Sequence, residues 1–151
     1  MISNTADYAL RAIVFLADNA GEAHTTEEIA RATKVPVGYL AKIMQNLARH
    51  RLVASQRGLH GGFTLVRDPK ELTIYDVVQA VDPIARIDRC PLQLEGHGTD
   101  LCPLHRTVDE ALARVEEIFR RTTIHEMIHQ PGAKRPLCSY PSEEAGPVAS
   151  A

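Results

Sequence analysis

The chain has 151 residues, of which 44% are hydrophobic, and its formal net charge is −2. This length suits one domain or a small domain with an appended element, and the hydrophobic fraction is enough for a packed core. No apolar run approaches the roughly 20 residues of a membrane span, and the N-terminus lacks the basic leader of a signal peptide. We therefore expect a cytoplasmic protein whose three cysteines serve as reduced thiols, metal ligands or sensors and not as a disulfide framework.

The small net charge conceals an asymmetry along the chain. Residues 1–70 contain 9 basic and 6 acidic side chains, whereas residues 71–151 contain 8 basic and 13 acidic ones. Between Ile29 and Arg67 there is no aspartate or glutamate, but there are seven lysines and arginines. Because a solvated surface normally mixes both signs, this stretch favours a polyphosphate partner such as DNA.

The first predicted element is a helix over about residues 5–19, whose apolar residues share one face and which Gly21 ends. Thr25 to Glu28 then follow the capping-box pattern, a hydroxyl with a carboxylate three residues later, which opens a helix. The short helix that it opens ends at a turn formed by Lys34 and Val35. We expect this helix to be the first member of a helix-turn-helix pair.

Residues 36–66 predict the second member of that pair, followed by a hairpin. Pro36 stands at the first helical turn, and one face of the helix is apolar: Leu40, Ile43, Met44 and Leu47. Two short strands, LVASQ and FTLV, are joined by RGLHGG, whose glycines permit a tight reversal. A helix followed by a basic, glycine-tipped hairpin indicates a winged helix-turn-helix. The alternative, a surface helix with an ordinary hairpin, does not explain the absence of acidic residues.

The middle of the chain predicts one further helix and then a loop. Thr73 and Asp76 cap a helix that runs through Val81 and ends before Pro83, and we expect it to buttress the domain. Residues 84–104 show little periodicity and read as a loop.

The longest predicted helix runs from His105 to about His129. Its apolar stripe comprises Val108, Ala111, Leu112, Val115, Ile118, Phe119 and Thr122, and its far face carries three acid-first i,i+4 pairs: Glu110–Arg114, Glu116–Arg120 and Glu117–Arg121. A small winged domain cannot cover such a stripe, so we expect a second copy to cover it in a homodimer. The alternative is a core helix within one chain. From Pro131 onwards, Pro, Gly and Ser predict a disordered tail that includes Cys138.

With these elements placed, the chain resembles the Rrf-type family of bacterial winged helix-turn-helix transcriptional regulators, which includes IscR-, NsrR- and RirA-like members. The matching pieces are DYALRA (7–12), GYLAKIMQNL (38–47), RGLHGGF (57–63), LTIYDVVQAVD (72–82) and TTIHEMI (122–128). The resemblance implies a mainly helical fold with a small hairpin wing, organised as a DNA-binding domain (1–82), a cluster-binding loop (83–104), a dimerisation helix (105–130) and a tail (131–151).

The resemblance also implies an iron-sulfur cluster. Family members hold it with three loop cysteines at intervals of six; here Cys90 and Cys102 match the outer two, and Gly96 stands at the middle position. His105 matches the histidine of IscR-like members, and Asp7 matches the aspartate that NsrR-like members donate from the other subunit. Because a 2Fe–2S cluster accepts imidazole on one iron, these four residues predict that cluster type, with Glu95 and His97 as substitute ligands. A cluster-free or thiol-sensing regulator is the alternative.

A different class of protein is suggested by His125, Glu126 and His129, which form the H-E-x-x-H pattern of zinc hydrolases. Arg135 occupies the place of a third histidine, and Pro131 ends the helix at once. We therefore expect no enzyme activity.

The sequence thus predicts a dimeric regulator, acting as a repressor, that binds a DNA operator. At the start of the recognition helix, the predicted contacts with the major groove are Val37, Gly38, Tyr39, Lys42 and Gln45. In the wing, the predicted contacts with the minor groove or phosphates are Arg57, Gly58, His60 and Gly61.

Overall fold

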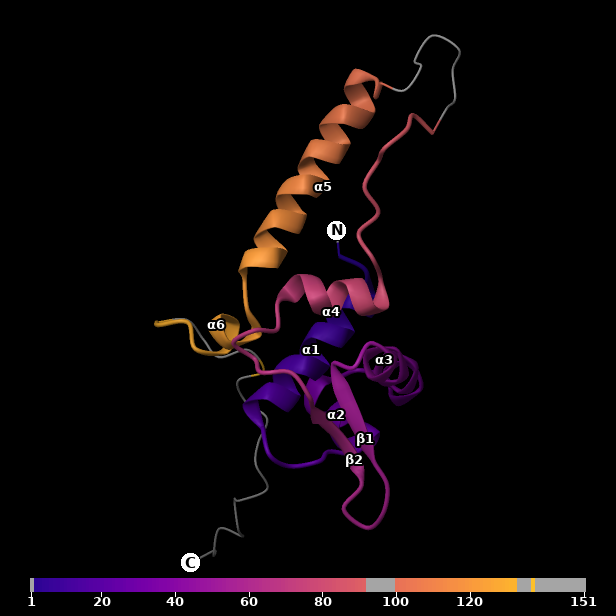
Figure 1. Cartoon of the computed structure of the whole chain (residues 1–151). Helices are drawn as coiled ribbons and strands as arrows, with labels where there is room; N and C mark the ends of the chain where they lie inside the picture. The colour runs from indigo at the N-terminus through magenta and orange to yellow at the C-terminus, as the bar shows by residue number, and fades with distance from the viewer. Residues whose placement is uncertain (1, 92–99, 133–136, 138–151) are drawn as a thin grey trace, which may run out of the picture.

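A computed structural model describes residues 2–91, 100–132 and 137 of the chain. Its elements, in chain order, are α1 (Asn4–Asp18), α2 (Thr26–Thr33), α3 (Val37–Arg49), β1 (Val53–Gln56), β2 (Gly62–Leu65), α4 (Ile74–Val81), α5 (Pro103–Arg121) and α6 (Ile124–Ile128). The predicted fold class, mainly helical with a small antiparallel hairpin, is confirmed. Figure 1 shows α1–α4, α6 and the hairpin packed together, while α5 projects away from them.

Helix α1 lies at the centre of the core and packs against α2, α3, α4 and α6. Ala6, Ala9 and Ala12 are fully buried on it, and these small side chains let neighbouring helices approach closely. Ile13 and Leu16 are buried beside them. Burying each such large side chain stabilises the fold by about 1.5–3 kcal/mol. Packing against α1 therefore holds α2 and α3 in their positions.

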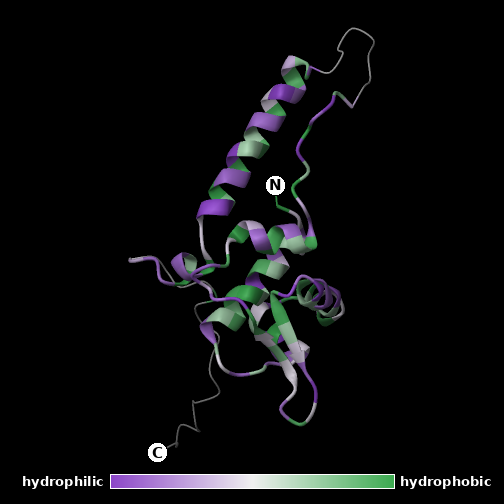
Figure 2. Ribbon diagram, viewed as in Figure 1, coloured by the Kyte–Doolittle hydropathy of each residue, from purple (hydrophilic) through white to green (hydrophobic). Residues whose placement is uncertain are grey.

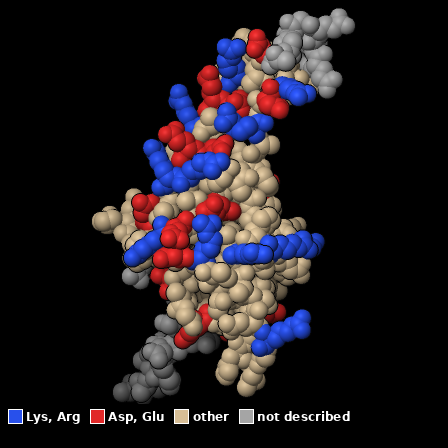
Figure 3. All heavy atoms as spheres, in the orientation of Figure 1, with Lys and Arg blue, Asp and Glu red and all other residues tan. Residues whose placement is uncertain are grey.

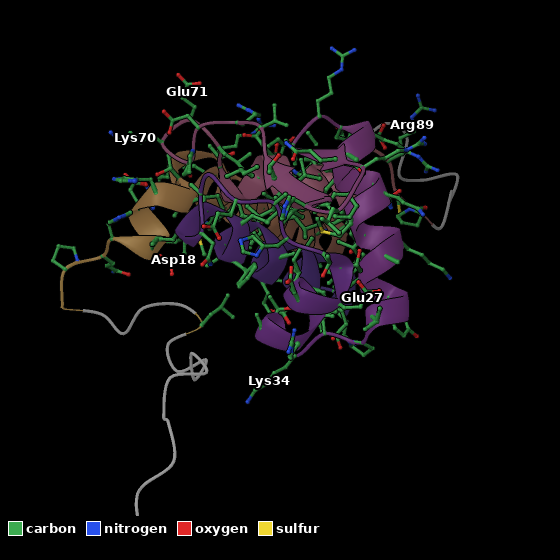
Figure 4. All side chains as sticks on the ribbon, turned by 90° about the horizontal axis from the view of Figure 1, so that it is seen from below. Asp18, Glu27, Lys34, Lys70, Glu71 and Arg89 are labelled. Carbon is green, nitrogen blue, oxygen red and sulfur yellow. The ribbon has the colours of Figure 1, made fainter. Side chains whose placement is uncertain are left out.

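The predicted helix starts are confirmed in atomic detail. Glu28 Oε2 accepts a hydrogen bond from Thr25 N at 2.8 Å, and Asp76 Oδ2 accepts one from Thr73 N at 3.1 Å. Lys34 makes the turn between α2 and α3 with a left-handed backbone, φ 55°, and its side chain points away from the domain (Figure 4). Pro36 differs slightly from expectation, because it is the N-cap of α3 and not a residue of its first turn.

The hairpin, called the wing below, pairs Val53 with Leu65 and Gln56 with Gly62. The backbone of His24, just before α2, extends this sheet: His24 N donates to Phe63 O at 3.1 Å, and Phe63 N donates to His24 O at 2.7 Å. Gly62 has φ 150°, and a Cβ there would overlap the backbone of His24. Only glycine therefore lets the wing lie this close to the helical domain.

The C-terminal helix departs from the prediction. A single helix from His105 to about His129 is wrong: α5 begins at Pro103 and ends at Arg121, and α6 follows after a break at Thr122 and Thr123. Ile124 N donates to Leu72 O at 2.8 Å, and Ile124 and Ile128 are buried in the core. The chain therefore turns back onto the domain instead of continuing along the axis of α5.

A capping box explains where the new helix starts. Thr123 Oγ1 accepts from Glu126 N at 3.2 Å, and Glu126 Oε2 accepts from Thr123 N at 2.9 Å. Loss of such a cap typically costs about 1 kcal/mol. We expect Thr123→Ala to lower the free energy of unfolding by this amount in urea titrations. Thr107→Ala, on the exposed α5, should change it by less than about 0.5 kcal/mol; equal effects of the two variants would contradict the role of the cap.

The predicted tail (131–151) lies mostly outside the described residues, and so does Cys138. Leu137 is an exception, since it is half-buried and packs against the hydrophobic core. No helix in the described parts of the chain is both long and apolar enough to cross a membrane.

Candidate DNA-binding face and metal site

Helix α3 has one buried and one exposed face. Leu40, Ile43, Met44 and Leu47 are buried against the core, which fixes the rotation of the helix. The five residues predicted to meet DNA all lie on the exposed side: Val37, Gly38, Tyr39, Lys42 and Gln45. Tyr39 is 66% exposed, and a Cβ added at Gly38 would meet no atom within 4 Å. This outward face, called the α3 face below, presents a phenol, an ammonium group and an amide to any partner that lies along it.

The wing tip is the second exposed feature on this side of the chain. Arg57, Gly58 and His60 are exposed and Gly61 is half-buried, and the reversal is closed by a hydrogen bond from Gly61 N to Gly58 O at 2.9 Å. Leu59 is 96% exposed at the tip. Leu59 is not among the residues predicted to contact DNA, although an apolar residue between Gly58 and His60 in RGLHGG indicates an exposed hydrophobic side chain at the tip. Apolar side chains at such tips can pack into a DNA minor groove.

The region of α3 and the wing differs from α5 in the distribution of its charged side chains. Within the described part of the chain, Arg67 is the only one of the seven basic residues between Ile29 and Arg67 that pairs with a carboxylate, that of Asp76 at 3.3 Å. Along α5, in contrast, acidic and basic side chains alternate (Figure 3). Of the three ion pairs predicted there, the structure shows Glu116–Arg120 at 2.7 Å. Unpaired cations near α3 and the wing suit contacts with phosphate.

Three of the four predicted metal ligands come together at the start of α5. The Nδ1 atom of His105 lies 3.2 Å from Cys102 Sγ and 3.7 Å from Cys90 Sγ. The three donor atoms all lie within 4.8 Å of one another, and no other group of three or more such side chains was found among the described residues. Cys90 is buried, with 6% exposure. Two thiolates and an imidazole are typical ligands of iron and zinc. We call these residues the three-ligand group.

Local helix geometry brings two of these ligands together. Cys102 is the N-cap of α5, Pro103 occupies the first helical turn, and His105 follows three residues after the cap. Side chains at the N-cap and three residues later lie side by side, as in a capping box. The N-terminus of a helix also favours negative charge, such as that of a thiolate. The C-x-x-H spacing at a helix start therefore builds half of the site by itself.

The fourth predicted ligand lies elsewhere in the same protomer. Asp7 is in the first turn of α1, where its carboxylate pairs with Arg11 at 2.6 Å, and it does not belong to the three-ligand group. The substitute ligands Glu95 and His97, and Gly96 between them, lie outside the described residues.

The segment that carries Cys90 is fastened to α5 by an ion pair that the sequence did not predict. Arg86 donates to Asp109 from Nε at 2.7 Å and from Nη2 at 2.6 Å, and Ile87 N donates to Asp109 Oδ1 at 2.9 Å. The hydrogen bonds from Arg86 and Ile87 lower the pKa of Asp109 from 3.8 to about 2.

This lowered pKa gives an expected pH dependence. The carboxylate is favoured in the folded state, so the interaction stabilises the fold fully above pH 3.8 and is lost as the pH falls through about 2. A carboxyl carbon NMR titration should place the midpoint of Asp109 near 2. A midpoint at the ordinary aspartate value would show that the ion pair does not persist in solution.

The H-E-x-x-H motif is not arranged for catalysis. The carboxylate of Glu126 caps Thr123, and the rings of His125 and His129 stack on each other with centroids 4.1 Å apart. His129 Nδ1 also lies 2.9 Å from His125 O. The residue that would be the general base therefore holds the start of a five-residue helix.

Comparison with known proteins gives consistent matches. Residues 2–130 match the Rrf2 family, described as an iron-dependent transcriptional regulator. The chain is 31% identical over 132 residues to an HTH-type transcriptional regulator of Aquifex aeolicus, covering 85% of this chain and 92% of that one. It is 30% identical over 122 residues to the HTH-type transcriptional regulator IscR of Sodalis glossinidius, covering 80% and 74%. The structure of CymR, the global cysteine regulator of B. subtilis, matches with a TM-score of 0.69 at 25% identity, covering 83% and 94%.

Proposed function

This chain belongs to the Rrf2 family and is a winged-helix transcriptional regulator, not an enzyme; we propose that it binds a two-fold-symmetric DNA operator as a homodimer under the control of a metal centre. The observation that carries the proposal is the α3 face. The apolar side of α3 is buried in the core, while the five residues of the opposite side are exposed to solvent and accessible to DNA.

DNA recognition then divides between two elements. Tyr39, Lys42 and Gln45 on α3 contact base edges and phosphates in the major groove, where a helix fits. Val37 and Gly38 allow close approach at the N-terminal end of the helix. Arg57 and His60, with Gly58 and Gly61 shaping the reversal, place the wing in the adjacent minor groove or on phosphate. As a repressor, the protein acts in the cytoplasm, where the bacterial chromosome lies.

Dimerisation is supported by the state of α5. None of its residues is buried within the protomer, and Val108, Val115 and Ile118 are between 39% and 47% exposed. Figure 2 shows hydrophobic and hydrophilic residues alternating along this projecting helix. Exposed apolar stripes on a long helix typically pack against a partner, and a second copy of α5 provides a matching one.

We propose that the metal centre is an iron-sulfur cluster of the 2Fe–2S type. The donors fit its chemistry, because such clusters accept both thiolate and imidazole ligands. Cys90, Cys102 and His105 would hold it, with Asp7 of the partner subunit as the fourth ligand. When bound, the cluster would supply sensitivity to redox state, nitric oxide or iron supply. Since the ligands come from both α5 and the segment before it, occupancy would affect the spacing of the two DNA-binding domains.

A thiol sensor without a cluster is the second candidate. The observation in its favour is that Cys90 Sγ and Cys102 Sγ lie within 4.8 Å of each other, so the two thiols are close neighbours even without a metal.

Operator titrations at several salt concentrations test the DNA-binding proposal. Lys42→Ala and Arg57→Ala should each weaken binding, and loss of one phosphate contact should lower the slope of log K against log salt by about one unit. Lys70→Ala is the matched control, because Lys70 lies across the domain from Lys34 and the helix-turn-helix turn (Figure 4). Equal effects of all three substitutions would contradict the assignment of the α3 face and the wing.

A further inference from the structure

We propose that Asp109 is a positioning residue for the metal site: through Arg86 and Ile87 it holds the segment that carries Cys90 against α5, which carries Cys102 and His105. This inference rests on the proposed metal centre. We call the contacts among Arg86, Ile87 and Asp109 the clasp.

The two halves of the three-ligand group are fixed by different means. Cys102 and His105 belong to the start of one helix, so hydrogen bonding in α5 sets their separation. Cys90 belongs to residues 82–91, which form no helix or strand. Eleven residues separate Cys90 from Cys102, so hydrogen bonding within one helix does not set the distance between these two ligands. Contacts between the segment and α5 therefore contribute to holding Cys90 beside the helix.

The clasp is placed to do this. Arg86 precedes Cys90 by four residues, and Asp109 follows His105 by four residues, so Asp109 and His105 lie on the same side of α5. Figure 1 shows the segment before residue 92 running alongside this helix. The clasp and the three-ligand group are thus successive contacts between the same two pieces of chain.

The geometry of the clasp is more restrictive than that of an ordinary surface ion pair. Two of the three guanidinium nitrogens of Arg86, Nε and Nη2, and the backbone N–H of Ile87 donate to the two oxygens of the Asp109 carboxylate. Such a bidentate arrangement fixes direction as well as distance. Glu116, two helical turns farther along α5, forms a second ion pair with Arg86, from Oε2 to Nη1 at 3.6 Å, and this further restricts the position of the guanidinium. Asp109 itself is only 16% exposed.

The clasp should favour metal binding, because it orders the segment that carries Cys90 before the metal arrives. A flexible segment must lose conformational freedom when its cysteine becomes a ligand, and that loss weakens binding. A segment already held by the clasp loses less, so the metal meets a nearly formed site. Removing a group that hydrogen-bonds directly to a metal ligand typically weakens metal affinity about 10- to 100-fold, and we expect the lower end of this range for the clasp, which orients the segment and not the ligand atom.

Titration of the full-length apoprotein with Co²⁺ tests the role of Asp109, because thiolate–Co²⁺ absorption reports ligation by cysteine directly. Asp109→Asn and Arg86→Gln should each weaken Co²⁺ binding about tenfold, and the double variant should be no weaker than either single one. Glu110→Gln is the matched control: it removes the same charge from the adjacent position, where the structure shows no ion pair with any described residue. It should bind Co²⁺ like the unaltered protein.

Hydrogen exchange of the Ile87 amide provides a readout that needs no metal. This N–H donates to Asp109, so it should exchange faster in Asp109→Asn than in Glu110→Gln. Unchanged Co²⁺ affinity in Asp109→Asn would overturn the positioning role while leaving the metal centre intact. Failure of the unaltered protein to bind Co²⁺ would refute the metal centre itself, and with it any ligands for the clasp to position.

Discussion

Anaerobic reconstitution with iron and sulfide should give coloured protein with about two irons and two sulfides per protomer, and Cys90→Ala or Cys102→Ala should each abolish the colour. The reason is the small number of donors. The described part of the chain brings only two cysteine sulfurs and one imidazole together, so loss of one cysteine leaves one sulfur, one imidazole and Asp7 of the partner subunit where four ligands are required. This is the largest effect expected of any single substitution in the site.

Two further variants refine this expectation. His105→Ala should yield a labile cluster with a shifted visible spectrum, since neutral imidazole is the weaker ligand and the helix start that holds Cys102 remains. Cys138→Ala serves as the thiol control and should leave the iron content unchanged. Colourless protein from the unaltered chain, or full colour in Cys90→Ala, would refute the assignment of the ligands.

Val115→Glu should convert the dimer to monomers and sharply reduce operator affinity. Val115 lies on the apolar stripe of α5 and is 39% exposed in the protomer. In a dimer with α5 at the seam, the substitution would bury a carboxylate against its own copy, which costs several kcal/mol when the charge is unpaired. Because binding to two half-sites requires two linked recognition helices, dissociation would reduce affinity for the whole operator.

Sedimentation velocity measures this result directly. Arg114→Glu is the control, because it introduces the same side chain at an exposed, charged position next to Val115 and should leave the dimer intact. A Val115→Glu protein that remains dimeric with unchanged strength would place the dimer interface elsewhere.

The elements whose signals are local could be predicted from the sequence. The capping boxes at Thr25 and Thr73 and the apolar face of α3 depend on residues at most four apart, and the structure contains all of them. Cys102 and His105 were predicted as ligands only through the family resemblance, and it is the structure that places Cys102 at the N-cap of α5 with its Sγ 3.2 Å from His105 Nδ1.

Two features of the structure were not predicted: the break between α5 and α6, which has a local signal, and the Arg86–Asp109 ion pair, which depends on residues far apart in the chain. The apolar stripe continues to Thr122 and therefore predicts one uninterrupted helix, although Thr123 and Glu126 carry the same capping pattern as Thr25–Glu28 and Thr73–Asp76. The Arg86–Asp109 pair spans 23 residues. Nothing in either neighbourhood distinguishes these two charges from others on the surface, so tertiary packing alone selects them.

Footprinting of the unaltered protein on fragments selected from its own genome, in metal-loaded and metal-free forms, tests the regulator most directly. The predicted result is a protected site with two-fold symmetry, its half-sites about 34 Å apart, bound with clearly different affinities by the two forms. Protection that is absent from every fragment would contradict DNA recognition by the α3 face, and equal affinities of the two forms would contradict control by the metal centre.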